Sequence, residues 1–232
     1  MRHQGFGNLQ KASLLGLGNG GPCAISAYIR RDFFENLHDD CVNSIGTMKA
    51  VIVILFLGVL LHQTYGALIT RAQWGARAPT GTSKFSGVIP YVVIHHSVSP
   101  GVCSTTDACK TAMRSMQNYH MNTNGWADIG YSFAVGGDGN IYEGRGYNVV
   151  GAHAPGYNSQ SIGLLLIGDF SKSNAPANMV TAAKNFISSA VSAGKLSSTY
   201  KLIGHRQALA TECPGDKLYA QIKTWSRYTA NP

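Results

Sequence analysis

The chain has 232 residues, of which 44% are hydrophobic and 13% are charged, and its formal net charge at pH 7 is +8. This composition is typical of a soluble globular protein, and the basic balance either favours polyanions such as bacterial wall polymers, anionic lipid or nucleic acid, or serves solubility alone. No run of Lys and Arg with interleaved aromatic residues occurs, which argues against a nucleic-acid partner.

The chain begins with two segments that differ from the rest. Residues 1–47 have a mixed composition, whereas residues 48–66 are typical of a secretory signal peptide, with a basic residue, the apolar run 51–61 and a polar exit. The apolar run is shorter than the ~20 residues of a membrane-spanning helix, so no stable membrane insertion is expected. Because signal peptides begin a chain, we interpret Met48 as the start of translation and the upstream segment as an artefact of gene prediction. A signal-anchor with a cytoplasmic tail is the alternative.

Residues 67–232 fit one domain and keep most of the positive charge, with 14 Lys and Arg against 7 Asp and Glu. Three cysteines fall in this part. In an oxidising extracellular compartment Cys103 and Cys109 are expected to form a disulfide. Cys213 is then left over as a reactive thiol, an intermolecular bridge or a metal ligand.

The first predicted elements are a strand and a helix. Residues 90–97, PYVVIHHS, read as a buried strand that ends in polar residues. A helix follows Cys103, with Ser104 or Thr105 as its N-cap. Its predicted buried face consists of Cys109, Met113, Met116 and Tyr119.

The remaining elements alternate between strands and helices. They are a hairpin over 131–145 around Asp138-Gly139, a central strand at 161–170, a helix from Met179 to Val191 ended by Gly194, a strand at 200–206, and a helix with Leu218, Ile222 and Trp225. This order predicts a single α/β domain with a central mixed β-sheet flanked by helices.

Three residues at the ends of these elements have side chains that suit zinc. His95 and His205 each close a predicted strand, and Cys213 follows in the loop TECPG. Strand ends that meet at one sheet edge commonly form sites in α/β domains. Two imidazoles and a thiolate leave a fourth position of a tetrahedral Zn²⁺ open to water, whose pKa then falls from ~15.7 toward ~7. Each residue also has a structural interpretation, as a core histidine or an inert buried thiol, and only one of His95 and His96 can face the site.

The chain closely resembles the peptidoglycan recognition proteins, which share a fold with phage-type N-acetylmuramoyl-L-alanine amidases. The resemblance covers roughly residues 68–230 and looks like the short, secreted insect-type branch. It rests on four stretches in the family's order: VVIHHS, YHMNTNGWADIGYSFAVGGDGNIYEGRGYNVVGAHAPGYN, SIGLLLIGDF and LIGHRQALATECPG.

The resemblance implies a zinc amidase, since His95, His205 and Cys213 match the ligands of the family's enzymes, whereas its receptors typically lack the cysteine. It implies Tyr131 as the catalytic residue that donates a hydrogen bond to the oxyanion, and Thr211 as a helper near the zinc-bound water. The expected reaction cuts the amide between the lactyl group of N-acetylmuramic acid and L-alanine. A binding-only immune receptor is the alternative, and damping of immune signalling and direct killing of bacteria both stay open.

The expected partner is bacterial peptidoglycan or its muropeptides. The muropeptide contacts that the resemblance implies are His120, Tyr131, His153 and Asn158. The positions that it links to diaminopimelate-type stem peptides are Gly125, Trp126 and Arg145. Diaminopimelate carries an extra carboxylate, which Arg145 can clamp with two hydrogen bonds, although a solvated hairpin charge is the alternative.

Overall fold

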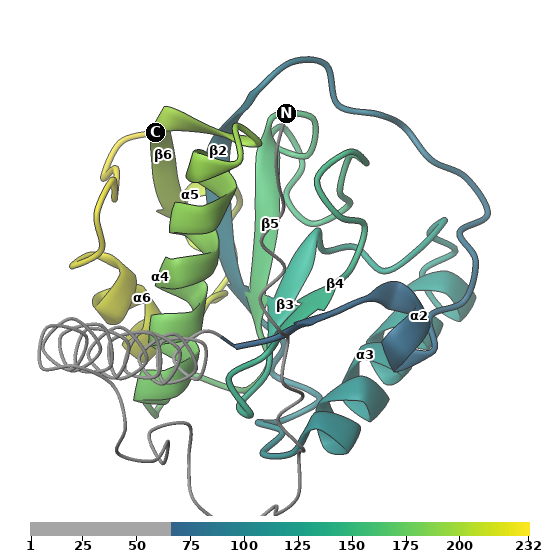
Figure 1. The fold of residues 1–232 in the computed structure, drawn as a ribbon. Helices are drawn as coiled ribbons and strands as arrows, with labels where there is room; N and C mark the ends of the chain where they lie inside the picture. Colours follow the sequence, from purple (N-terminus) through teal and green to yellow (C-terminus); the bar gives the residue numbers. More distant parts are fainter. Residues whose placement is uncertain (1–65) are drawn as a thin grey trace, which may run out of the picture. The chain divides into compact units, whose positions relative to one another are not determined.

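The computed structural model describes residues 66–232, shown in Figure 1. The upstream segment 1–47 and the predicted signal peptide 48–66, apart from Gly66, lie outside the described residues. Within the described part of the chain, no helix combines the length and the apolar character that a membrane crossing requires.

A six-stranded sheet forms the centre of the domain. Its strands are β1 (Leu68–Ile69), β2 (Ile89–His96), β3 (Phe133–Val135), β4 (Ile141–Glu143), β5 (Ser161–Leu166) and β6 (Leu196–Gly204). The spatial order is β1-β4-β3-β5-β2-β6, and every neighbouring pair is parallel except the β3–β4 hairpin. The predicted mixed sheet, the hairpin and the inner position of the strand after Ser161 are therefore confirmed.

Helices cover both faces of the sheet, as Figure 1 shows. They are α2 (Arg71–Trp74), α3 (Thr106–Asn122), α4 (Ala177–Ser192), α5 (His205–Ala208) and α6 (Asp216–Ile222). One core cluster joins Ile94 and Leu164 to α4 and α6, and a second joins Leu165 to α2 and α3. Because successive side chains of a strand face opposite ways, Ile94 on the α4 side places His95 on the α3 side.

The buried face of α3 differs from the prediction at one position. Thr105 is the N-cap, and Cys109, Met113 and Met116 are buried as predicted, but Tyr119 is 58% exposed. The residue that points inward is His120. Since each helical residue advances by about 100°, position 120 lies almost directly above Cys109, whereas Tyr119 is rotated to the edge of that face.

The end of the last strand also differs from the prediction. β6 spans Leu196–Gly204, earlier than the predicted 200–206, and His205 opens the short helix α5. The chain turns there because the Gln207 side-chain oxygen accepts a hydrogen bond from the Gly204 N–H at 3.0 Å. The His205 side chain therefore projects from a helical turn just beyond the strand.

The predicted disulfide between Cys103 and Cys109 is present and connects the loop before α3 to the first turn of that helix. Cys213 is the free cysteine of the described residues. Because Cys213 forms no disulfide there, its thiol is available as a metal ligand.

Candidate metal centre

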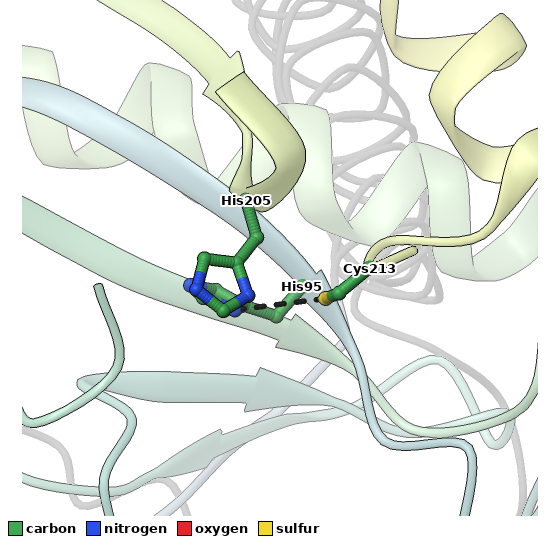
Figure 2. A group of neighbouring side chains, drawn as sticks. All are labelled: His95, His205 and Cys213. Carbon is green, nitrogen blue, oxygen red and sulfur yellow. Dashed lines mark hydrogen bonds between the residues drawn. The ribbon is translucent and has the colours of Figure 1, made fainter. Parts of the chain in front are cut away.

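His95, near the end of β2, lies together with His205, which directly follows β6, and with Cys213 (Figure 2), and their ligand-type atoms are all within 4.8 Å of one another. The register explains the meeting of the two histidines. Ile94 pairs with Gly204 in the parallel β2–β6 ladder, so the next residue of each chain segment is a histidine. The sulfur of Cys213 is 3.8 Å from His95 Nδ1.

The loop that carries Cys213 is held by Arg206, which sequence reasoning missed. The Arg206 N–H donates to the Cys213 carbonyl at 2.9 Å. Its guanidinium donates to the Glu212 carbonyl and, at 2.8 Å, to the Asp216 carboxylate. These contacts fold residues 209–216 back onto the histidines. Partners six and ten residues away follow no helical or strand period, so the sequence offers no signal for them.

The Cys213 sulfur also receives a backbone donor. The His96 N–H points at Sγ from 3.4 Å, while the Thr211 hydroxyl accepts from the Cys213 N–H at 3.3 Å. Burial raises the pKa of Cys213 to about 11, although the His96 hydrogen bond and the Arg206 charge act in the opposite direction. A thiolate at this position therefore needs a further cation, and a bound dication provides one.

Both histidines are suited to act as neutral ligands. Burial, followed by the charges of His153, His205 and His96, holds the pKa of His95 well below its usual range. Burial and then His96 lower the pKa of His205. His205 Nε2 is buried and has no hydrogen-bond partner within residues 66–232. Two neutral imidazoles, one with an unpartnered buried nitrogen, and one thiol fit the ligand preference of zinc.

Tyr131 lies beside this cluster, with its ring centroid 5.2 Å from that of His95. Burial and, secondly, the Cys213 charge raise the pKa of Tyr131 above its ordinary value. The phenol therefore keeps its proton at neutral pH and can act as a hydrogen-bond donor at the cluster. Tyr131 and Thr211, which the resemblance implies as helpers, thus lie next to His95 and Cys213 respectively.

An aromatic pair continues the site away from the cluster. His120 stacks on Trp126 with centroids 4.8 Å apart and stands 5.7 Å from Tyr131. His120 Nδ1 accepts from the Gly130 N–H at 3.1 Å, and burial lowers the pKa of His120 to about 4. Trp126 is 37% exposed, and Gly125 has φ +70°, a conformation that favours glycine. The pair therefore presents an indole next to the predicted catalytic tyrosine.

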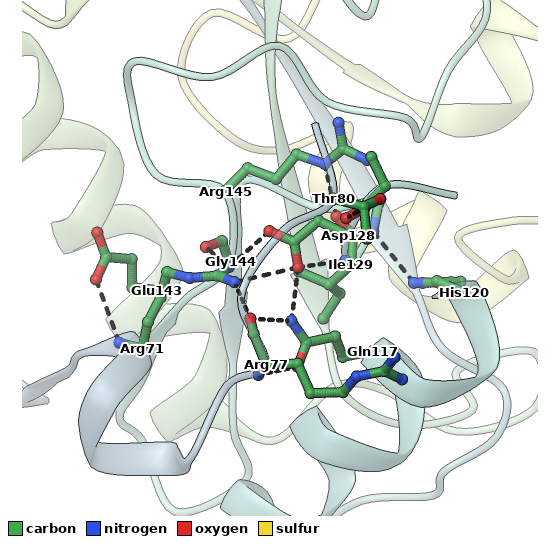
Figure 3. Close-up of polar contacts among 12 residues, drawn as sticks. Arg71, Arg77, Thr80, Gln117, His120, Asp128, Ile129, Glu143, Gly144 and Arg145 are labelled. Carbon is green, nitrogen blue, oxygen red and sulfur yellow. Dashed lines mark hydrogen bonds and ion pairs between the residues drawn. The ribbon is translucent and has the colours of Figure 1, made fainter. Parts of the chain in front are cut away.

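Arg145 is tethered to the main chain rather than freely solvated, as Figure 3 shows. Its Nε donates to the Ile129 carbonyl at 2.7 Å and its Nη1 to the Val150 carbonyl at 2.8 Å. The carboxylate of the neighbouring Asp128 forms an ion pair with Arg71 at 2.9 Å and accepts a hydrogen bond from the Gln117 side-chain amide at 2.6 Å. The Nη2 amine of Arg145 has no partner in the described part of the chain, so it is available to an anion.

His153 and Asn158 lie behind the cluster. The Asn158 side-chain oxygen accepts from the N–H groups of His153 and Ala154, both at 2.8 Å. His153 is only 7% exposed, and its Nδ1 is 3.0 Å from His95 Nε2. Burial, with smaller effects from His205 and Arg145, lowers the pKa of His153 to about 3. His153 therefore contacts the cluster directly through His95, whereas Asn158 holds the backbone of His153.

Comparison with known proteins identifies several relatives. The family profile Amidase_2, described as N-acetylmuramoyl-L-alanine amidase, matches residues 85–216. Peptidoglycan-recognition protein LB of Drosophila melanogaster is 52% identical over 162 residues, which is 70% of this chain and 70% of that protein.

Two solved structures extend the comparison. A variant of Drosophila PGRP-LB in complex with tracheal cytotoxin matches with a TM-score of 0.70 at 51% identity, covering 72% of this chain and 98% of that one. Peptidoglycan recognition protein LE in complex with tracheal cytotoxin, described as a monomeric diaminopimelic acid-type peptidoglycan, matches with a TM-score of 0.69 at 39% identity. That match covers 70% of this chain and 96% of the other.

Proposed function

The chain belongs to the peptidoglycan-recognition proteins with an Amidase_2 domain, and from that premise we propose that it is a zinc-dependent N-acetylmuramoyl-L-alanine amidase. It binds bacterial peptidoglycan in innate immunity and cuts the bond between the lactyl group and L-alanine. The observation that carries the proposal is the complete set of His95, His205 and Cys213 within 4.8 Å. A binding-only receptor needs the residues that contact the muropeptide but has no use for the three converging ligands.

The residues of the chain divide the chemistry among them. His95, His205 and Cys213 would hold zinc, which when bound supplies the Lewis acidity that lowers the pKa of water and polarises a carbonyl. The protonated phenol of Tyr131 donates a hydrogen bond to the oxygen of the scissile carbonyl as negative charge develops there. The Thr211 hydroxyl accepts from the Cys213 N–H, which holds it beside the ligand sulfur, and its own proton remains for a hydrogen bond near the zinc-bound water.

Diaminopimelate-type stem peptides are the proposed preferred substrates. The relatives PGRP-LB and PGRP-LE were both solved with tracheal cytotoxin. In this chain Trp126 presents an exposed indole, and Arg145 offers an unpartnered amine on a guanidinium fixed by two carbonyls. A preorganised guanidinium loses little freedom when it binds the additional carboxylate of diaminopimelate.

The direct test is release of stem peptide from purified peptidoglycan, with and without a chelator. We expect release by the protein, loss of release after chelation, and recovery when zinc is returned. A chain that binds the wall but releases no peptide with zinc present would be a receptor, which is the alternative function.

Arg145→Thr should lose most of the preference for diaminopimelate-type over lysine-type muropeptides while keeping zinc. A hydrogen bond to a charged group contributes ~1.5–3 kcal/mol, so the ratio of the two rates should fall by roughly tenfold or more. Parallel rate measurements on the two substrates give the ratio. Arg145→Lys is the control that keeps the charge without the planar fork, and we expect an intermediate ratio. Equal rates on both substrates in the parent protein would refute the preference.

We also propose that the protein is secreted and begins near Ala67, because the segment 48–66 has the pattern of a signal peptide. Expression in a eukaryotic secretory system followed by N-terminal sequencing of the medium tests this expectation. Recovery of the chain in membranes with residues 1–47 attached would instead support the signal-anchor alternative.

A further inference from the structure

Two sides of the His95 ring meet different partners. His95 Nδ1 lies 3.8 Å from Cys213 Sγ, whereas His95 Nε2 lies 3.0 Å from His153 Nδ1. The two imidazoles meet edge to face, with an angle of 87° between their planes. When two ring nitrogens face each other at this distance, one must carry a proton and the other must accept it.

The direction of this hydrogen bond is set on the far side of His153. The Ser161 hydroxyl donates to the Tyr157 carbonyl at 2.7 Å, and a carbonyl can only accept. The Ser161 oxygen is thereby left as an acceptor, and it lies 3.5 Å from His153 Nε2. The proton of the His153 ring therefore belongs on Nε2, which leaves Nδ1 to accept from His95.

From this chain of contacts we infer that His153 is a positioning residue for the metal centre. It accepts the His95 Nε2 proton, fixes the tautomer and the orientation of that ring, and so presents the unprotonated His95 Nδ1 on the side of Cys213. The inference rests on the proposed zinc-dependent function. Histidines that ligate metals typically donate their other N–H to such an acceptor, and loss of that acceptor commonly costs 10–100-fold in metal affinity.

The surroundings of His153 hold the ring in this one orientation. A side-chain carbon added at Gly151 or at Gly163 would overlap the His153 ring, so two glycines leave the space that the ring fills. Asn158 fixes the backbone of His153 through its side-chain oxygen. A ring held this tightly and only 7% exposed is better placed to orient His95 than to meet a substrate in solvent.

Zinc affinity, measured by competition with a chromogenic chelator, separates this role from simple packing. His153→Leu fills the space but cannot accept a hydrogen bond, and we expect its zinc dissociation constant to rise by about 10–100-fold. His153→Asn places an acceptor oxygen near the position of Nδ1 and should bind zinc more tightly than His153→Leu. Gln117→Leu is the matched control, because it also removes a buried hydrogen-bonding side chain but one that contacts none of the three ligands, and its zinc affinity should stay within about twofold of the parent.

A second measurement reads the tautomers directly in the unaltered protein. Nitrogen chemical shifts of ¹⁵N-histidine-labelled, metal-free protein should show the proton on Nε2 of both His95 and His153. A proton on His95 Nδ1 overturns the inference, even if His153→Leu fails to fold. If the parent binds zinc and His153→Leu binds it equally well, the role of His153 is wrong while the proposed function stands. If the parent binds no zinc, the proposed function fails as well.

Discussion

Cys213→Ser should lose most of its bound zinc and release no stem peptide, yet still bind insoluble peptidoglycan. A serine hydroxyl stays protonated at neutral pH and is a poor ligand, whereas a thiol ionises beside a dication. The residues proposed to contact the muropeptide lie largely elsewhere, at Trp126 and Arg145 among others, so wall binding should remain within about tenfold, or ~1.4 kcal/mol. Atomic absorption, chromatography of released peptide and a wall pull-down on one sample measure the three properties.

The loop around Cys213 provides a favourable setting for this test. Arg206 and its main-chain contacts hold residues 209–216 without using the thiol, so the serine variant should keep the loop conformation. Cys213→Asp is the matched control, since a carboxylate is also a zinc ligand, and it should retain more zinc than the serine variant. If the serine variant hydrolyses at a rate near that of the parent, the assignment of Cys213 as a zinc ligand is wrong.

Tyr131→Phe should reduce hydrolysis by roughly 10²–10³-fold in kcat, the usual cost of losing one donor to a developing oxyanion. Zinc content and wall binding should stay close to those of the parent, because the substitution keeps the ring that packs 5.2 Å from His95 and removes only the hydroxyl. Steady-state kinetics on a defined muropeptide would separate a fall in kcat from a rise in KM.

Tyr119→Phe is the control for the tyrosine substitution. Tyr119 lies on α3 near the same region but is 58% exposed and lies outside the buried face of the helix. The Tyr119→Phe substitution should therefore leave kcat unchanged. A Tyr131→Phe enzyme with the parental kcat would show that the phenol proton plays no part in the reaction.

The sequence predicts those parts of the site that depend on strand pattern. His95 lies at the end of the apolar run of β2 and His205 directly follows β6, and two parallel neighbours end at the same edge of the sheet. The exchange of Tyr119 for His120 on α3 shows the limit of such patterns, since the predicted face continues from Cys109 at i+10, whereas helical rotation continues the buried face at i+11. The same rotation is what brings His120 toward Tyr131.

Other parts of the site depend on contacts between distant residues. The position of Cys213 depends on Arg206 and on the His96 N–H, which is 117 residues away in the sequence. Likewise, the placement of His153 behind His95 depends on two glycines, one of which lies on β5. Such contacts leave no periodic signal in a single sequence, so resemblance to a family could suggest Cys213 and His153 but neither their geometry nor the role of Arg206.

The support of the Cys213 loop has an evolutionary consequence. The loop takes its shape from Arg206, from the Thr211 hydroxyl and from the turn into α6, and these contacts do not require a metal to be bound. If the proposed amidase activity holds, a single-nucleotide change from a cysteine codon to a serine codon would abolish it while sparing the residues proposed to contact the muropeptide. An enzyme and a non-catalytic receptor on this fold would then differ by as little as one residue, so that one gene duplication followed by one substitution would be enough to separate the two functions.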